Sequence, residues 1–180
     1  PLPEMPDLIE SLPKQLKDAF QKLKWNSVYN LNLGLEKIDS AARHWVYFPQ
    51  PDISFFRVGF FHNFSSSLVP AGKNSLYVEI AYSRNKPVDK NKIISQSIKD
   101  LKKMNIIRSR KDVLVQDVND IKYGYPVYDF HYCASRKRIA EFFSKNNIIS
   151  CGRYGSWRYM SMEDVLLEGK DVAERVMGIS

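Results

Sequence analysis

The sequence has little of what a metal site or a disulfide requires. Only two of its 180 residues are cysteines, Cys133 and Cys151, and only three are histidines, His44, His62 and His131. Neither cysteine belongs to a CxxC pair, and no histidine lies near one at a metal-ligand spacing, which argues against a zinc site. We therefore expect no metal. We expect both cysteines to be small buried residues in a reducing compartment, and so a cytoplasmic protein.

Glycine is missing from the places where a dinucleotide fold needs it. None of the eight glycines forms a GxGxxG motif between a strand and a helix, so no complete dinucleotide-binding fold is expected within this chain. No apolar run reaches the 18 residues of a membrane-spanning helix. The first residues, PLPEMPDL, include no initiator methionine and no signal pattern. They suggest a segment cut or processed from a longer polypeptide.

Basic residues exceed acidic ones, 27 to 20, and the formal net charge is +7. A surface of this charge attracts anions, among them small phosphorylated molecules and nucleic acid. Because the two signs are interspersed along the chain, solvated surface lysines are an equally simple explanation. The hydrophobic fraction of 44% is typical of a chain with a packed core.

Hydrophobic spacing predicts both helices and strands. Helices are expected over 7–25 with a break at Pro13, and over 89–104, 135–147 and 162–177. Strands or extended segments are expected over 27–36, 44–50, 53–61, 75–83, 112–128 and 148–151. Strands that follow one another through short links favour a mostly antiparallel sheet, here flanked by helices, so we predict an α+β fold.

The stretch GRYGSWRYMSMED, residues 152–164, concentrates groups that bind anions. Its two glycines let the backbone approach a ligand, and Arg153 and Arg158 offer forked donors for phosphate. Ser161 and Asp164 have the spacing of a capping box, so a helix N-terminus is expected there. These features suit a pyrophosphate or a nucleotide-like ligand. The same sequence is also explained by a tight turn with arginines on the surface and a tryptophan in the core.

Two further regions carry polar groups among aromatic residues. Arg57 lies in the apolar run ISFFRVGFF, and strand alternation places Phe55, Arg57 and Gly59 on one face. Because an unpaired buried charge is costly, we expect this face to line a cavity that supplies an anion, unless it is exposed to solvent. Tyr47 precedes it, and Tyr125 belongs to KYGYPVYDF, which is either a rigid polar wall or ordinary aromatic packing.

Three segments, HWVYFP with FFRVGFFHNFS, YGYPV, and GRYGSWRY, resemble in the same order the second half of flavin-dependent UDP-galactopyranose mutases. More broadly they are similar to amine-oxidase and protoporphyrinogen-oxidase-like flavoproteins. The resemblance runs from about Pro1 to Ser180 and is strongest at 44–70 and 122–164. It departs from the mutases at Asn63–Ser66, where NFSS replaces NYSP, and after the Gly-Arg turn, where SMED replaces NQD.

The resemblance implies how the whole protein is organised. In such flavoproteins an N-terminal part binds FAD, a sheet domain covers the substrate, and a Gly-Arg turn with its helix returns to the flavin. Residues 1–150 would then be the substrate domain, and residues 151–180 would return to an FAD domain that this chain lacks. The catalytic residues would lie in that missing part, so the chain alone is not expected to turn over. The mutases use reduced FAD as a nucleophile on the anomeric carbon, with no net redox change.

The resemblance also assigns residues. The substrate-binding set is Tyr47, Arg57, Tyr125, Arg153 and Tyr159. The cofactor-binding set is Gly152, Arg153, Gly155, Trp157, Ser161 and Met162. The implied substrate is a nucleotide sugar for cell-surface polysaccharide such as lipopolysaccharide. The alternatives are an amine-oxidase or protoporphyrinogen-oxidase-like flavoenzyme and a non-enzymatic module that binds anions or nucleic acid. A diphosphate substrate needs Arg57 in the pocket with Arg153, whereas an amine does not. Without an FAD domain, the final helix and the 152–159 face should expose apolar surface or be covered by a second copy.

Overall fold

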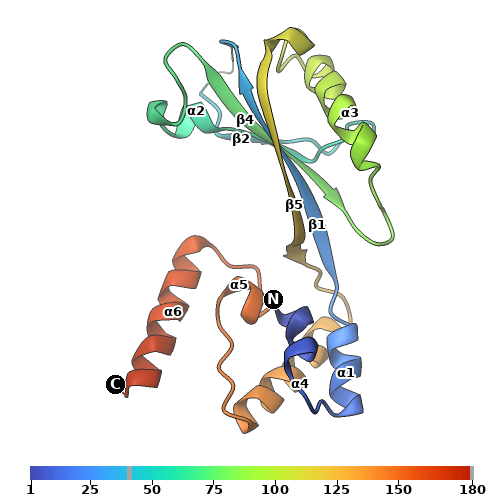
Figure 1. Ribbon diagram of the computed structural model, residues 1–180, viewed down its shortest axis with the longest axis vertical. Coiled ribbons are helices and arrows are strands. Elements are labelled where there is room, and N and C mark those ends of the chain that lie inside the picture. The colour runs from blue at the N-terminus through green and yellow to red at the C-terminus, as the bar shows by residue number, and fades with distance from the viewer. Residues whose placement is uncertain (40–41, 179–180) are drawn as a thin grey trace. The chain divides into compact units, whose positions relative to one another are not determined.

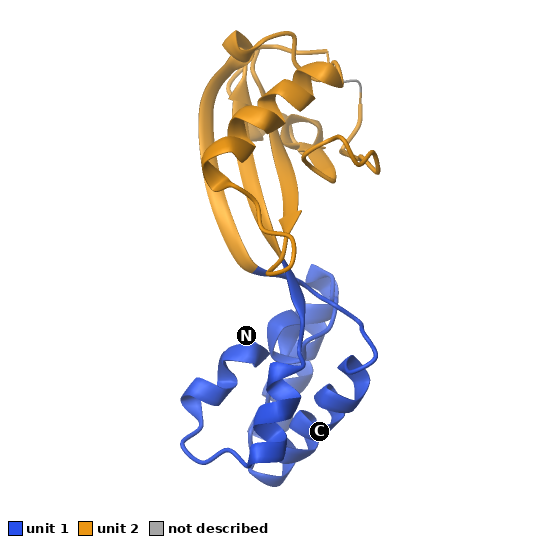
Figure 2. Cartoon of the chain, turned by 90° about the vertical axis from the view of Figure 1, so that its right-hand side faces the viewer, with its two compact units in different colours: residues 1–26, 123–180 blue, residues 27–122 orange. Residues whose placement is uncertain are grey.

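The computed structural model of the protein describes residues 1–39 and 42–178. The chain forms two compact units, one of Pro1–Asn26 with Tyr123–Ser180 and one of Ser27–Lys122 (Figure 2). The division reflects which residues pack together into a compact unit. The expected boundary at residue 150 marks where the chain would return to a flavin domain, which is a separate question and stays a prediction.

A five-stranded sheet forms the frame of residues 27–122, in the order β2-β3-β4-β1-β5 (Figure 1). The strands are β1 (Trp25–Leu35), β2 (Trp45–Tyr47), β3 (Arg57–Phe60), β4 (Asn74–Tyr82) and β5 (Val113–Pro126). The β1–β4, β2–β3 and β3–β4 pairs are antiparallel. The helical elements of this unit are α2 (Phe61–Phe64), η2 (Ser66–Leu68), α3 (Lys90–Lys103) and η3 (Arg110–Asp112). The predicted α+β fold is confirmed.

One face of the sheet is packed and the other is open. Alternate residues of β1 and β4 are buried, with Leu31 opposite Val78 and Leu33 opposite Leu76. The helix α3 covers this face, as Figure 1 shows. Its residues Ile98 and Leu101 belong to the same core. Burying each such side chain contributes about 1.5–3 kcal/mol, which fixes the register. The residues between them therefore lie on the opposite face, among them Asn30, Asn32, Arg57, Tyr77 and Glu79.

The other unit is helical. Its elements are η1 (Leu2–Leu8), α1 (Lys14–Gln21), α4 (Tyr132–Lys145), α5 (Gly152–Gly155) and α6 (Met162–Met177). Pro13 is the N-cap of α1, which confirms the predicted break. The core of this unit includes Phe20, Ile139, Phe143 and Trp157. Among the described residues, no helix has both the length and the apolarity to cross a bilayer.

Three local predictions were wrong. The segment 148–151 is not a buried strand, and Ile149 is 48% exposed. Both cysteines are exposed, because Cys133 lies on the outer side of α4 and Cys151 lies in that irregular segment. The strand expected over 53–61 covers only Arg57–Phe60, because Ile53 N–H donates to the Gln50 carbonyl in a turn.

Alanine substitutions at two glycines of the open face, Gly59 and Gly34, should change the free energy of unfolding differently. A Cβ at Gly59 would lie 2.0 Å from the Tyr77 ring, whereas one at Gly34 would lie 3.5 Å from Val115, an ordinary contact. Gly59→Ala should lower the free energy of unfolding by about 1–3 kcal/mol through overpacking. Gly34→Ala, the matched control, should raise it by about 0.5 kcal/mol, because glycine weakens strands. Urea unfolding of both variants checks this, and equal midpoints would contradict the close ring packing.

Candidate functional site

The Gly-Arg turn begins at Gly152, whose φ of 73° is in the left-handed region that glycine tolerates best. One helical turn, α5, follows and ends at Gly155. A side chain at Gly155 would approach the Ser150 hydroxyl to 2.9 Å, so the chain passes closely there. Both predicted glycine positions therefore have a structural reason within the turn itself. Whether they also approach a cofactor stays a prediction.

Arg153 lies beside two of the predicted substrate-binding tyrosines. Its guanidinium carbon is 4.9 Å from the ring centroid of Tyr125 and 4.8 Å from that of Tyr159. The two rings are 6.1 Å apart and inclined by only 17°. Nη2 of Arg153 donates to the Gly124 carbonyl at 2.9 Å, which fixes the guanidinium against β5. The structure thus brings Tyr125, Arg153 and Tyr159 together, and we call them the Arg153 cluster.

The Arg153 cluster keeps its positive charge. Among the described residues no carboxylate forms an ion pair with Arg153, which contacts carbonyl oxygens and aromatic rings. Its Nε is buried without a hydrogen-bond partner. A buried donor left unsatisfied costs about 1–3 kcal/mol, so an oxygen from a ligand would be stabilised here. Tyr159 is 63% exposed, so the cluster reaches the surface at this ring.

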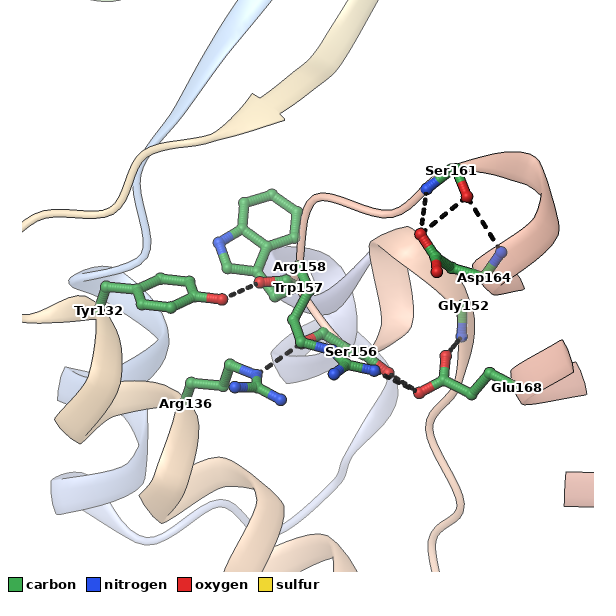
Figure 3. A network of polar contacts seen from close by, with 9 residues as sticks. All are labelled: Tyr132, Arg136, Gly152, Ser156, Trp157, Arg158, Ser161, Asp164 and Glu168. Atoms are coloured by element: carbon green, nitrogen blue, oxygen red, sulfur yellow. Dashed lines mark hydrogen bonds and ion pairs between the residues drawn. The ribbon is translucent and has the colours of Figure 1, made fainter. Parts of the chain in front are cut away.

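Glu168, which the sequence reasoning missed, holds the turn in place (Figure 3). Its carboxylate accepts from Gly152 N–H, from the Ser156 hydroxyl at 2.9 Å and from Arg158 Nη2 at 3.0 Å. It therefore neutralises Arg158, one of the two arginines that the motif offered to an anion. The only sequence signal for Glu168 is its position two helical turns after the capping box.

The start of α6 matches the prediction and is already satisfied. The Ser161 hydroxyl accepts from Asp164 N–H at 3.1 Å, and the Asp164 carboxylate accepts from Ser161 N–H at 2.7 Å, as Figure 3 shows. The Ser161 N–H, and after it the Ser161 hydroxyl, donate to the Asp164 carboxylate, and both bonds lower the pKa of Asp164 below its usual value. With Glu163 and Asp164 in the first turn, the positive end of the helix dipole is partly offset. The helix N-terminus is a weaker anion site than its sequence suggested.

Trp157 lies in the core. Only 1% of its surface is exposed, and its ring packs edge-on against Trp25 and Tyr123. Its carbonyl accepts from the Tyr132 hydroxyl at 2.7 Å, and its φ is 49°. This position favours the alternative of a core tryptophan, which the sequence analysis left open. Contact of Trp157 with a cofactor stays a prediction. Ser161 and Met162 are exposed, and Met162 is 86% accessible.

A hollow of about 580 Å³ lies between the turn and α6. It contains the predicted cofactor residues Gly152, Arg153, Gly155, Ser161 and Met162. Its remaining lining is Cys151, Tyr154, Met160, Val165 and Leu166. Except at Arg153 the side chains are mostly apolar, so the hollow suits a flat, largely apolar ring that carries a polar or anionic edge.

The second predicted group, Tyr47 and Arg57, belongs to the other compact unit. Arg57 Nη1 donates to the Tyr47 hydroxyl at 3.1 Å, and Arg57 forms an ion pair with Glu79, directly opposite on β4. Arg57 lines a hollow of about 390 Å³ with Tyr77 and Phe61, as expected of a cavity-lining residue. The anion that it was expected to need is supplied by Glu79.

Phe55 corrects the expected alternation. It is 2% exposed and packs edge-on against Phe48 in the core under α3, whereas Arg57 and Gly59 lie on the open face. The regular strand begins only at Arg57, so strict alternation does not extend back to Phe55. Phe64, which stands in the NFSS departure, is 48% exposed and stacks on Trp45.

The final helix exposes apolar surface as expected. None of the residues of α6 is buried. Its exposed apolar residues are Met162, Val165, Leu166, Leu167, Val176 and Met177. An amphipathic helix draws most of its stability from an apolar face that packs, so this face is suited to contact with another surface.

No known protein-family profile matches the chain. Among solved structures, reduced UDP-galactopyranose mutase matches 100% of this chain with a TM-score of 0.89 and 22% identity. A protein of Exiguobacterium sp. 255-15 assigned as a protoporphyrinogen oxidase matches 95% of this chain with a TM-score of 0.69 and 13% identity. This chain spans only 41% and 39% of the lengths of those two proteins. It therefore has the fold of part of a UDP-galactopyranose mutase.

The carboxylate of Glu168 predicts a local effect on stability. Glu168→Gln removes the charge from three hydrogen bonds and should cost about 1–3 kcal/mol, limited by the partial exposure of Arg158. Because α6 buries no side chain, the loss should be local. We expect it to appear as faster hydrogen exchange of the backbone amides at Gly152 and along α6. The control, Glu174→Gln, removes only an exposed pair with Lys170 and should change exchange little. Identical exchange in both variants would contradict a holding role.

Tyr132 predicts a dependence on alkaline pH. Burial, followed by neighbouring Tyr128, raises the pKa of Tyr132 to about 12. A tyrosine whose pKa is raised on folding stabilises the fold while protonated, fully below its unfolded pKa of about 10, and the stabilisation is lost as the pH rises through about 12. The stability difference between the wild type and Tyr132→Phe should shrink over this range. A constant difference, measured by chemical unfolding at each pH, would contradict the assignment.

Proposed function

We propose that this chain is the substrate-domain and C-terminal portion of a FAD-dependent oxidoreductase or mutase that acts on a nucleotide sugar in cell-surface polysaccharide synthesis. The observation that carries the proposal is the Arg153 cluster. It presents an uncompensated guanidinium, with a buried donor, beside the rings of two tyrosines. The same fold occurs in a protein named for a nucleotide sugar, UDP-galactopyranose mutase.

The residues of the cluster suit a diphosphate. A guanidinium binds phosphate oxygens with paired N–H donors, and a low-dielectric surround of aromatic rings strengthens that attraction. Arg153 would bind the diphosphate, and the phenol groups of Tyr125 and Tyr159 would orient it. Because the Gly124 carbonyl and the two rings already fix the guanidinium, little side-chain freedom is lost on binding.

The residues also fit a flavin. The hollow beside the turn combines apolar side chains from α6, such as Val165 and Leu166, with Arg153 at one side. The apolar residues would exclude water from the ring, and Arg153 Nε could donate to an oxygen of the cofactor or of the substrate. When bound, FAD would supply the electron-rich ring that the chemistry requires. The residues of this chain bind, orient and exclude water.

One observation favours the alternative of an amine-oxidase or protoporphyrinogen-oxidase-like enzyme. The charge of Arg57 is balanced by Glu79, so the hollow that Arg57 lines carries little net positive charge. Such a hollow accepts a neutral or cationic substrate as readily as an anion. The two proposals share one fold, so only the identity of the substrate distinguishes a nucleotide-sugar enzyme from an amine-oxidase or protoporphyrinogen-oxidase-like enzyme.

Flavin and ligand titrations test the proposal on the full gene product that contains this chain. The purified protein should show the visible absorption of a flavin, and UDP or a UDP-sugar should perturb that spectrum. A flavin spectrum that responds to amines and is indifferent to UDP would favour the alternative. Absence of any flavin, with and without added FAD, would overturn both.

The Arg153 cluster predicts the effect of two substitutions. Arg153→Lys keeps the charge and loses the forked geometry, so UDP should bind about 10–100-fold more weakly. Tyr159→Phe should weaken binding less, by about 3–10-fold, because one hydroxyl is lost. Arg138→Lys, on the exposed side of α4, is the control and should bind UDP normally. Calorimetry measures all three, and wild-type affinity in Arg153→Lys would exclude the cluster as the diphosphate site.

A further inference from the structure

Positive charge is concentrated in one segment of the chain. Residues 86–111 contain nine lysines and arginines against two aspartates. One of those aspartates, Asp100, is only 4% exposed and accepts from Ser54 N–H and from Gln96. Its carboxylate therefore contributes little to the outer surface. The third carboxylate of these elements, Asp112 at the end of η3, accepts from the backbone N–H groups of Arg108 and Ser109, so the charged side chains exposed along α3 and η3 are mainly basic.

Six of these nine cations form no ion pair within the part of the chain that the structure describes, namely Lys86, Lys99, Lys102, Arg108, Arg110 and Lys111. Lys90, Lys92 and Lys103 are paired with aspartates, and Arg110 donates to Gln116. The remaining cations on α3 and beyond it are all exposed, and we call them the α3 basic surface: Lys99, Lys102, Arg108 and Lys111. The first two are neighbours at i and i+3 on the helix. Residues 104–109 join α3 to η3, so the other two follow the C-terminal end of α3 in the chain.

Structural needs explain only part of this surface. A lysine in the last turn of a helix interacts favourably with its dipole, which accounts for Lys102. The same reason does not extend to Arg108 and Lys111, which lie outside α3. Because Ile98 and Leu101 face the core, the polar side of α3 is its outer side. Neighbouring unpaired cations such as Lys99 and Lys102 repel one another, and a polyanion would relieve that repulsion.

We propose that the α3 basic surface holds the protein on an anionic phospholipid membrane. Residues 84–112 contain no aromatic side chain, so this segment supplies no stacking platform of the kind that single-stranded nucleic-acid binders use. The same region lacks the aromatic anchors that dominate protein–protein interfaces. Flexible lysines on a convex helix suit a fluid layer of negative headgroups, to which each basic residue adds attraction. Leu114, which is 49% exposed just beyond η3, adds a short apolar contact.

This contact would be peripheral and reversible. The contact depends on electrostatic attraction, so membrane binding weakens as salt screens the headgroup charges. The inference does not depend on the flavin or on the Arg153 cluster. The proposed membrane contact and the proposed flavoenzyme function can therefore fail independently. In a protein that supplies sugars for cell-surface polysaccharide, such a surface would place the product beside membrane-bound acceptors.

Vesicle co-sedimentation of the full gene product tests the proposal. The protein should sediment with phosphatidylcholine–phosphatidylglycerol vesicles at low salt, and should remain soluble with phosphatidylcholine alone or at high salt. Changing Lys99, Lys102, Arg108 and Lys111 together to glutamine should weaken binding by about 30-fold or more. The control changes four exposed cations of α1 and α4 to glutamine, namely Lys14, Lys17, Lys137 and Arg138, and should retain binding.

Three outcomes would overturn the proposal. One is the same loss in both variants, since net charge alone would then explain binding. Another is no binding of the wild type to anionic vesicles. The third is tighter binding to single-stranded RNA than to vesicles at the same salt, which would point to nucleic acid. Unfolding curves of both variants establish that lost binding is not lost folding, because the substituted side chains are exposed and should leave stability nearly unchanged.

Discussion

The geometry of the candidate site depends on the carboxylate of Glu168. The helix α6 buries none of its side chains, so apolar packing cannot hold it beside the turn. Glu168 instead bonds the backbone at Gly152 and the side chains of Ser156 and Arg158. Charge-assisted bonds of this kind are stronger than neutral ones. Through them the turn that carries Arg153, and the hollow that α6 borders, acquire one defined arrangement.

The two arginines singled out by the sequence have different electrostatic roles. Arg57 is opposed by Glu79 across an antiparallel pair, so its charge is balanced within the fold. Arg153 is held by carbonyl oxygens and tyrosine rings, which direct it without neutralising it. A guanidinium that is positioned and uncompensated is prepared for an anion. This contrast makes Arg153 the stronger basis for a diphosphate site.

The surfaces of the sheet unit differ in the side chains that they carry. Its buried face, under α3, supplies the core, and its open face carries Asn30, Arg57, Tyr77 and Glu79 around a hollow. The outer side of α3 is basic and has no aromatic residue. Because only one face of the sheet is needed for stability, the open face and the outer helix surface are available for recognition.

The sequence by itself determined most of the helices and strands and the local motifs, although the segment 148–151 formed no strand. Alternation along β1 and β4, the break at Pro13 and the capping box at Ser161 and Asp164 are short-range patterns, and each formed as predicted. The grouping of Tyr125 with Arg153 and Tyr159 was found only through family resemblance. Tertiary structure alone decided that Glu79 neutralises Arg57, that Glu168 neutralises Arg158 and that Trp157 is core. The partner of a charge is set by what the fold brings within a few ångströms, and spacing along the chain does not encode that distance.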